Sequence, residues 1–200
     1  MTFAAVVLAG GDARRLGGAT KPALPVGGRP MLLRVLDAAP ADSPRVVVGP
    51  PTLRPLLPDG VVLTQEQPPG GGPVAGLAAG VRAVPDGIAQ VAVLSADLPF
   101  LTAEVLSGLC AARADGAEVA VLLDGSGRPQ WLCAVWRSDA LRRRLGAVGP
   151  TEGVRMRDLV GDATVRPVSV PDQPGPPPWF DCDTDEDLRR AEEWTHGDPG

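Results

Sequence analysis

Short apolar runs alternate along this chain with longer segments whose apolar residues recur at helical spacing. The run at 3–8 is apolar throughout and is followed by two glycines, which is typical of a buried parallel strand. In 30–39, Met31, Leu32, Val35 and Leu36 line one face of a helix. The same criteria predict strands at 3–8, 45–48, 61–64, 90–94, 118–122, 132–136 and 164–170, and helices at 30–39, 74–84, 102–113, 138–145, 152–160 and 185–194.

This alternation predicts an α/β fold with a mostly parallel sheet and helices on both faces. We expect a single domain over residues 1–195, because no repeat or flexible linker divides the chain, and a disordered tail at 196–200. The proline run at 174–178 is expected to be a stiff connector. Ligands on such sheets bind beyond the carboxyl ends of the strands, so the residues that follow each predicted strand are the candidate site.

Composition excludes several classes of protein. A net charge of −5 argues against a nucleic-acid partner, which needs a clustered basic surface. The three cysteines are far apart, make no metal-ligand spacing and are interpreted as buried thiols. The first apolar stretch ends at Gly10, too short for a secretion signal or a membrane span, so we expect a cytoplasmic protein without a membrane partner. A monomer is the simplest expectation, and the sequence leaves the oligomeric state open.

The scarcity of histidine narrows the chemistry. His196 is the only histidine and lies in the polar tail. Serine or cysteine triads and histidine-ligated zinc sites need an ordered imidazole close to the reacting group. The remaining chemistry must depend on carboxylates, lysine, arginine, backbone N–H groups and a hard metal ion.

A glycine-rich stretch at 8–18 follows the first predicted strand. Gly10 and Gly11 allow backbone N–H groups to approach a ligand closely, and Arg14, Arg15 and Lys21 supply positive charge suited to phosphate oxygens. The spacing matches neither the Walker motif nor the dinucleotide-binding motif. By themselves these residues leave a solvated surface turn equally open.

Carboxylates follow later elements. Asp97 comes directly after the apolar strand at 90–94 and is the predicted Mg²⁺ ligand, because Mg²⁺ prefers one or two carboxylates with substrate phosphates and water. A capping role for Asp97 is weakened by its distance from Thr102, where the next helix is expected. Asp181 and Asp183 precede the last helix, which Thr184 is expected to cap, and could face the metal.

Together these stretches resemble the molybdenum cofactor guanylyltransferase family. The resemblance covers residues 3–192 and is carried in order by Leu8-Ala9-Gly10-Gly11 with Arg15 and Lys21-Pro22, Gly72-Pro73-Val74-Ala75-Gly76, Ser95-Ala96-Asp97-Leu98-Pro99, 130–137 and 181–188. It implies a Rossmann-like nucleotidyltransferase fold of the nucleotide-diphospho-sugar transferase type. It also implies Mg²⁺-dependent transfer of GMP from GTP to molybdopterin, with release of pyrophosphate.

The resemblance also implies residue roles. Arg15, Lys21 and Asp97 would be catalytic, with the first two facing the triphosphate and Asp97 holding Mg²⁺. Nucleotide contacts would come from Leu8, Ala9, Gly10, Gly11, Lys21, Gly49, Glu66, Gln67 and Asp97. The acceptor side would hold Gln130, Arg137, Asp181 and Asp183.

Several positions depart from the family pattern. Thr20 replaces an aspartate before the lysine, Gly49 replaces an asparagine that meets the base, and Gln67 lies where an acidic contact is usual, unless Glu66 fills that role. The other departures lie on the acceptor side, at Trp131, Trp136, Asp181 and Asp183. The sister cytidylyltransferases typically read Leu-Ala-Ala-Gly, so Gly10 after Ala9 favours a guanine nucleotide.

The hypothesis is attack by an acceptor phosphate oxygen on the α-phosphorus of the nucleotide. Such chemistry needs positioning and charge neutralisation and no histidine base. Two alternatives stay open. One is a related nucleotidyltransferase that uses CTP, or another acceptor such as a sugar phosphate or a small phospho-acid. The other is a non-catalytic nucleotide-binding protein, suggested by Thr20, Gly49 and Gln67.

Overall fold

A computed structural model describes the chain except residues 1–2, 11–19, 115, 172–174 and 198–200. Part of the glycine-rich stretch and part of the predicted tail therefore lie outside the described residues. The main sheet contains β1 (Phe3–Leu8), β4 (Arg45–Val48), β5 (Val62–Thr64), β6 (Gln90–Ser95), β7 (Val119–Leu123), β8 (Pro129–Arg137) and β9 (Val165–Val168). The helices are α1 (Met31–Ala38), α2 (Pro73–Arg82), α3 (Ala103–Ala114), α4 (Ser138–Val148), α5 (Met156–Val160) and α6 (Asp185–Thr195).

The main sheet is mostly parallel, as predicted. Its strand order is β5-β4-β1-β6-β8-β7-β9, and β8 runs antiparallel to both of its neighbours. A tight turn between β7 and β8 reverses the chain, so β8 begins at the edge where the parallel strands end. This single reversal brings the residues around Gln130 to the carboxyl edge of the sheet.

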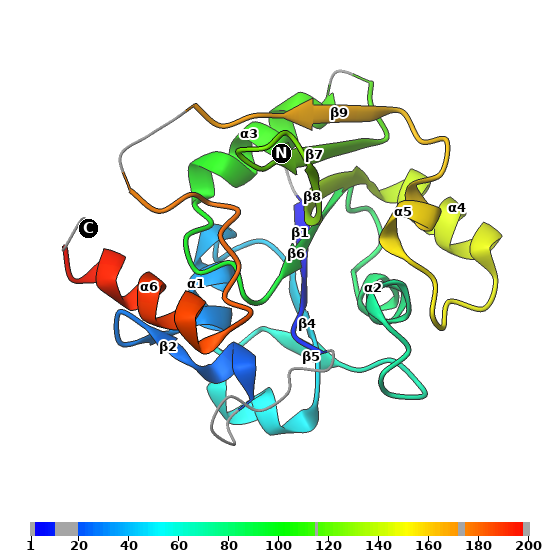
Figure 1. The fold of residues 1–200 in the computed structure, drawn as a ribbon. Coiled ribbons are helices and arrows are strands. Elements are labelled where there is room, and N and C mark those ends of the chain that lie inside the picture. The colour runs from blue at the N-terminus through cyan, green and yellow to red at the C-terminus, as the bar shows by residue number, and fades with distance from the viewer. Residues whose placement is uncertain (1–2, 11–19, 115, 172–174, 198–200) are drawn as a thin grey trace.

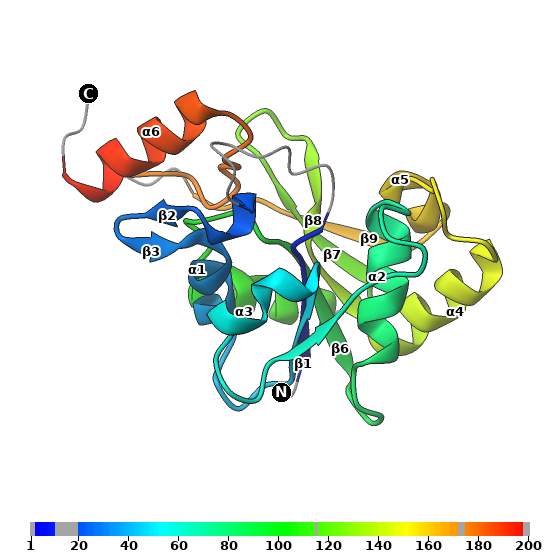
Figure 2. The same cartoon turned by 90° about the horizontal axis from the view of Figure 1, so that it is seen from below.

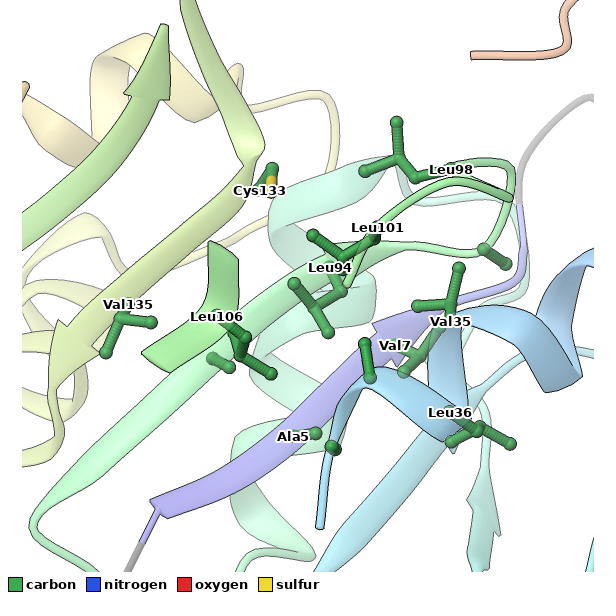
Figure 3. Close-up of a cluster of buried hydrophobic side chains, with 14 of the residues drawn as sticks. Ala5, Val7, Val35, Leu36, Leu94, Leu98, Leu101, Leu106, Cys133 and Val135 are labelled. Carbon is green, nitrogen blue, oxygen red and sulfur yellow. The ribbon is translucent and has the colours of Figure 1, made fainter. Parts of the chain in front are cut away.

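Helices cover both faces of the sheet. In Figures 1 and 2, α2, α4 and α5 lie on one side, while α1, α3 and α6 lie on the other. The fully buried strand β1 alternates between two cores, since side chains point to opposite faces of a strand. Ala5 and Val7 join the core under α1 and α3, part of which is drawn in Figure 3, whereas Ala4 and Val6 join the core under α2 and α4.

The helix α2 packs unusually close to the sheet. A Cβ atom added at Gly80 would overlap the Val6 side chain and would lie 2.8 Å from Cγ2 of Val48. Glycine at this point lets the helix backbone approach β1 and β4, and so places the N-terminus of α2 beside the ends of those strands.

Smaller elements support the carboxyl edge. A 3₁₀ helix, η1 (Lys21–Ala23), leads to a hairpin of β2 (Pro25–Val26) and β3 (Arg29–Pro30), and a second, η2 (Pro51–Leu56), follows β4. Between β9 and α6, residues 175–184 form what is here called the C-terminal strap, which ends at α6 beside the β2–β3 hairpin (Figure 2). Beneath α6, Val26 and Met31 share a small core with Cys182 and Ala191.

The structure differs from the expected elements in a few places. The helix predicted at 152–160 forms only at Met156–Val160, because Gly153 has a φ of +71° and turns the chain before it. The strand predicted at 132–136 begins three residues earlier, at Pro129. The expected caps are present: Thr102 accepts a hydrogen bond from the Val105 N–H, and Thr184 forms a reciprocal capping box with Asp187.

Candidate active site

The exits of β1 and β6 lie side by side at the carboxyl edge. Leu8 is in register with Ser95, and the Ala96 N–H donates to the Leu8 carbonyl at 3.0 Å. On the other side of β1, the Ala9 N–H donates to the Val48 carbonyl at 2.7 Å. The chain crosses from β1 to β4 through α1 on one face and reaches β6 through α2 on the other. Ligand sites in open α/β sheets lie at such a reversal of strand order.

A cavity of about 840 Å³ opens at this edge and is here called the larger cavity. It collects much of the predicted nucleotide site, from segments far apart in the sequence. Its predicted lining residues are Leu8, Ala9, Gly10, Lys21, Glu66, Asp97 and Asp183. Further lining residues come from the exit of β5 and the start of α2, namely Gln65, Pro69, Gly70, Gly72, Pro73 and Gly76. Gly70 and Gly72 of the loop before α2 thus form part of the cavity wall.

Glu66 is a buried acidic side chain that lines this cavity. It is only 7% exposed, and its Oε1 accepts a hydrogen bond from the Gly70 N–H at 2.9 Å. Its Oε2 faces the first turn of α2, where a Cβ added at Gly76 would lie 3.9 Å away. Gln67 is exposed and does not line the cavity, whereas Gln65 does. Of the two neighbours considered for an acidic nucleotide contact, the structure brings Glu66 to the cavity.

Gly49 lies behind the wall of the larger cavity. Its neighbours Val48 and Pro50 line the cavity, but Gly49 itself is buried against η2 and the exit of β1. A Cβ added there would lie 2.8 Å from Cδ1 of Leu53 and 3.1 Å from the Ala9 carbonyl oxygen. The absence of a side chain at Gly49 therefore serves close packing between segments that line the cavity.

Lys21 lies between two carboxylates. Its Nζ donates to Oδ2 of Asp97 at 2.7 Å and to Oδ1 of Asp183 at 2.6 Å. Burial by itself lowers the pKa of Lys21, but the hydrogen bonds and charges of Asp183 and Asp97 outweigh it, so the pKa is raised. The ammonium group is therefore charged at neutral pH and links the end of β6 to the C-terminal strap.

Asp97 is held in place from several sides. Ser95 Oγ donates to Oδ1 of Asp97 at 2.5 Å, and the Cys182 N–H donates to the main-chain oxygen of Asp97 at 3.2 Å. The first contact orients the carboxylate, and the second ties the strap to the end of β6. Ser95 and Cys182 were not identified as site residues from the sequence, since a serine after a strand and a lone cysteine carry no specific signal.

A smaller cavity of about 330 Å³ adjoins the larger one. The two share Ser95, Asp97, Leu132 and Asp183. The remaining walls of the smaller cavity are Leu98, Gln130, Trp131, Met156 and Asp181. Asp97 thus lies where the two cavities meet, with the β1 exit and Glu66 on one side and Gln130 and Asp181 on the other.

An irregularity in β8 shapes the smaller cavity. Val121 pairs with Ala134, but the next residue of β7, Leu122, pairs with Gln130. The extra residues on β8 include Trp131 and Leu132, and both line the smaller cavity. Bulges of this kind redirect side chains next to active sites.

Of the residues expected on the acceptor side, Asp181 lies at the smaller cavity and Arg137 does not. Asp181 lines the smaller cavity, and partial burial of its carboxyl together with the charge of Asp183 raises its pKa. Arg137 ends β8, where it pairs in register with Gln90 at the start of β6, and it forms an ion pair with Asp139. Its expected place on the acceptor side is wrong, because the antiparallel direction of β8 carries Arg137 to the opposite edge of the sheet from Gln130.

Gly11 and Arg15 lie outside the described residues, so their expected roles at the triphosphate stay predictions. In the described part of the chain, no helix is long and apolar enough to cross a membrane.

Comparisons with known proteins address the family and the fold of the chain. Residues 5–166 match the model of the MobA-like NTP transferase domain. A molybdenum cofactor guanylyltransferase of Rhodobacter capsulatus is 32% identical, with 96% of each chain covered. Among solved structures, molybdopterin-guanine dinucleotide biosynthesis protein A of Archaeoglobus fulgidus superposes with a TM-score of 0.71 at 22% identity, covering 95% of this chain and 97% of that one.

A second structural neighbour carries a different name. The 4-diphosphocytidyl-2C-methyl-D-erythritol synthase of Anaerococcus prevotii superposes with a TM-score of 0.72 at 13% identity, covering 98% of this chain and 96% of that one. At such identities the likeness shows the Rossmann-like fold alone, which is the predicted one. The domain match and the similarity over nearly the whole Rhodobacter protein show more: this chain belongs to the MobA-like NTP transferase family and is a nucleotidyltransferase.

Proposed function

We propose that this nucleotidyltransferase transfers GMP from GTP to the phosphate of molybdopterin, releases pyrophosphate and depends on Mg²⁺. The observation that carries the proposal is the position of the Lys21–Asp97 pair where two cavities meet. The larger cavity, at about 840 Å³, is in the size range of small-molecule sites and can take a nucleoside triphosphate. The name of the Rhodobacter relative supports GTP and a molybdenum cofactor precursor as the reactants.

The proposed reaction joins the contents of the two cavities. An oxygen of the acceptor phosphate attacks the α-phosphorus of GTP, the bond between the α-phosphorus and the bridging oxygen breaks, and pyrophosphate leaves with the electron pair. A phosphate monoester is already anionic at neutral pH, so the attack needs no histidine. The contribution of the protein is to align the reactants and to neutralise charge, the main requirements of phosphoryl transfer.

The position of Lys21 supports a role in binding the triphosphate. In the structure its ammonium is held by Asp97 and Asp183, and Lys21 lines the larger cavity. Phosphate oxygens entering the larger cavity would replace a carboxylate as its partner, which lets Lys21 stabilise negative charge as pyrophosphate leaves. Arg15 is expected to assist from the glycine-rich stretch.

The carboxylates fit a Mg²⁺ ion that arrives with its nucleotide. Asp97 would hold the ion, and Asp183, bound to the same lysine, offers a second set of oxygen ligands. Across the described residues no group of three or more histidine, cysteine, aspartate or glutamate side chains is arranged to hold a metal. Mg²⁺ is commonly bound by one or two carboxylates plus phosphates and water, which Asp97, Asp183 and a bound nucleotide would supply. When bound, the ion would neutralise charge on the phosphates.

Glu66 supports guanine as the base. Guanine presents two adjacent N–H donors on its Watson–Crick edge, N1–H and the 2-amino group, and a carboxylate can accept both. Cytosine offers only its amino group as a donor on the same edge. The position of Glu66 in the larger cavity, together with Gly10 after Ala9, favours GTP over CTP.

The test is to measure pyrophosphate release by the purified protein with each nucleoside triphosphate, with and without molybdopterin and Mg²⁺. We expect release only with GTP, molybdopterin and Mg²⁺ together. Turnover with CTP, a sugar phosphate or a small phospho-acid would replace the proposed substrates while keeping the reaction class. GTP binding without turnover on any acceptor would contradict the proposal.

A further inference from the structure

The turn between β7 and β8 is organised by one carboxylate. The Asp124 N–H donates to the Arg128 carbonyl at 3.0 Å, and the Gly127 N–H donates to the Asp124 carbonyl at 2.9 Å. Side-chain contacts complete the turn: Oδ1 of Asp124 accepts from the Ser126 N–H at 2.8 Å, from Ser126 Oγ at 2.7 Å and from the Arg128 N–H at 3.0 Å. These contacts close the hairpin that starts β8.

The other oxygen of Asp124 has a different partner. Oδ2 accepts a hydrogen bond from Nε2 of Gln130 at 2.9 Å. The hydrogen bonds that Asp124 receives, from the Ser126 hydroxyl first and then from the Arg128 N–H, hold the pKa of its carboxyl below the usual value despite some burial. Asp124 is therefore ionised at neutral pH, and an ionised carboxylate can only accept hydrogen bonds.

This contact decides the direction of the Gln130 carboxamide. A primary amide has a donor end and an acceptor end, and only the NH₂ end can face a carboxylate. The carbonyl oxygen of Gln130 is then the end that a ligand can meet in the smaller cavity, which Gln130 lines beside Trp131 and Asp181.

The hairpin tip is also supported from the C-terminal strap. A Cβ added at Gly125 would lie 3.5 Å from Cζ2 of Trp179, so the tip rests against the strap that carries Asp181 and Asp183. The turn that holds Gln130 through Asp124 therefore also contacts the strap, whose Asp181 lines the same cavity.

We infer that Asp124 is a positioning residue for the acceptor: it holds the Gln130 carboxamide with its oxygen toward the smaller cavity, where that oxygen accepts a hydrogen bond from an N–H group of the acceptor. The inference rests on the proposed function for the identity of the acceptor. Molybdopterin fits, because the amino group and the ring N–H of a pterin are donors of this kind.

The experiment reverses the direction of the Gln130 carboxamide with one substitution and then restores a hydrogen-bond acceptor in the smaller cavity with a second. In Asp124→Asn, the N–H groups of the turn still donate to the side-chain oxygen at position 124, so the new NH₂ group faces Gln130. The Gln130 carboxamide must then rotate to present its oxygen to that NH₂ group. The cavity then meets a donor in place of an acceptor. We expect the KM for molybdopterin to rise about tenfold, which is the effect of a lost and unmatched hydrogen bond, while the KM for GTP and the Tm stay unchanged.

Adding Gln130→Glu to Asp124→Asn supplies an acceptor again, because the carboxylate takes the new NH₂ with one oxygen and offers the other to the cavity. We expect most of the lost affinity to return in the double variant. Ser126→Ala is the matched control, since it removes a contact to Oδ1 and leaves Oδ2 and Gln130 in place. It should keep the wild-type KM for molybdopterin.

Failure of this inference and failure of the proposed function give different results. If the wild-type protein turns over and Asp124→Asn has an unchanged KM for molybdopterin, the inference is overturned and the proposed function stands. A lowered Tm that Gln130→Glu does not restore, with equal rises in both KM values, would also overturn it in favour of a structural role. Absence of wild-type turnover would overturn the proposed function. In that case the Kd for molybdopterin is measured by tryptophan fluorescence in the same variants. A Kd that rises in Asp124→Asn, recovers with Gln130→Glu and is unchanged in Ser126→Ala supports the inference, and an unchanged Kd in Asp124→Asn overturns it.

Discussion

The two cavities that meet at Asp97 are built from different parts of the fold. Most walls of the larger cavity come from the ends and exits of the parallel strands β1, β4, β5 and β6, together with the loop before α2 and its first turn. The smaller cavity uses the beginning of the antiparallel strand β8, its irregular stretch and the C-terminal strap. The first construction follows a general rule of parallel sheets, whereas the second depends on a strand reversal and on a segment from the end of the chain. The proposed nucleotide side is therefore the part that sequence can locate, and the proposed acceptor side is the part that depends on the tertiary structure.

Substitution of Asp97, which lines both cavities, should give the largest effect. In Asp97→Asn we expect kcat for pyrophosphate release to fall about 10³-fold, because one change removes the proposed metal ligand and a partner of Lys21. Asp183→Asn is the matched comparison, since the side chain of Asp183 is 67% exposed against 21% for Asp97. We expect it to lower kcat only about tenfold. Equal losses in the two variants would show that the carboxylates share one role.

Lys21→Ala tests the triphosphate side. Loss of the ammonium that lies between Asp97 and Asp183 should lower kcat about 10²–10³-fold, as expected for removal of one preorganised electrostatic contact. The KM for molybdopterin should change less than kcat. Loss of turnover together with a strongly lowered Tm would instead indicate that Lys21 mainly holds the strap in place. Kinetics equal to those of the wild type would show that Lys21 does not belong to the active site.

Glu66→Gln tests the base end of the larger cavity. The amide offers one acceptor where the carboxylate offers two, so the KM for GTP should rise about tenfold or more. The preference for GTP over inosine triphosphate, which lacks the 2-amino group, should shrink. Gln67→Ala is the control, because Gln67 is exposed and does not line the cavity. An unchanged preference in Glu66→Gln would assign the reading of the base to other residues.

Thr184→Ala probes the strap and should give the smallest effect. Thr184 accepts from the Asp187 N–H at 3.1 Å and its own N–H donates to Asp187 at 2.8 Å, forming the cap of α6. Loss of the cap should cost about 1 kcal/mol of the free energy of unfolding and lower the Tm by about 2–4 °C. Asp183 directly precedes the cap, so the KM for molybdopterin should rise more than the KM for GTP. The reverse order would contradict the assignment of the strap to the acceptor side.

The fold was largely accessible from the sequence because buried strands and amphipathic helices leave strong local patterns. The runs at β1, β4 and β6 are apolar and close to the predicted bounds. Short elements such as β2, β3 and η2 have too few residues to show a period, and they were not predicted. The direction of β8 was also not predictable, since a strand has the same pattern of side chains whichever way it runs.

The candidate site divides in the same way. Leu8 ends an apolar run, and Ala9, Gly10 and Asp97 come shortly after one, so strand exits identify them. Gln65 also follows a predicted strand directly but was not singled out, and the choice between Glu66 and Gln67 required the path of the loop after β5. Arg137 shows the limit most clearly: seven residues separate it from Gln130 in sequence, yet one extended strand carries the two to opposite edges of the sheet.

By itself the sequence determined the α/β architecture, the edge of the sheet that holds the candidate site and the presence of a single histidine, because periodicity and composition can be read without the fold. Only the tertiary structure decided that Lys21 is held by Asp97 and Asp183, residues 76 and 162 positions away. It also decided that Gln130 donates to Asp124 and that the two cavities share the carboxylates of Asp97 and Asp183. Such contacts join distant segments through packing and hydrogen-bond direction, and no local pattern in a single sequence records them.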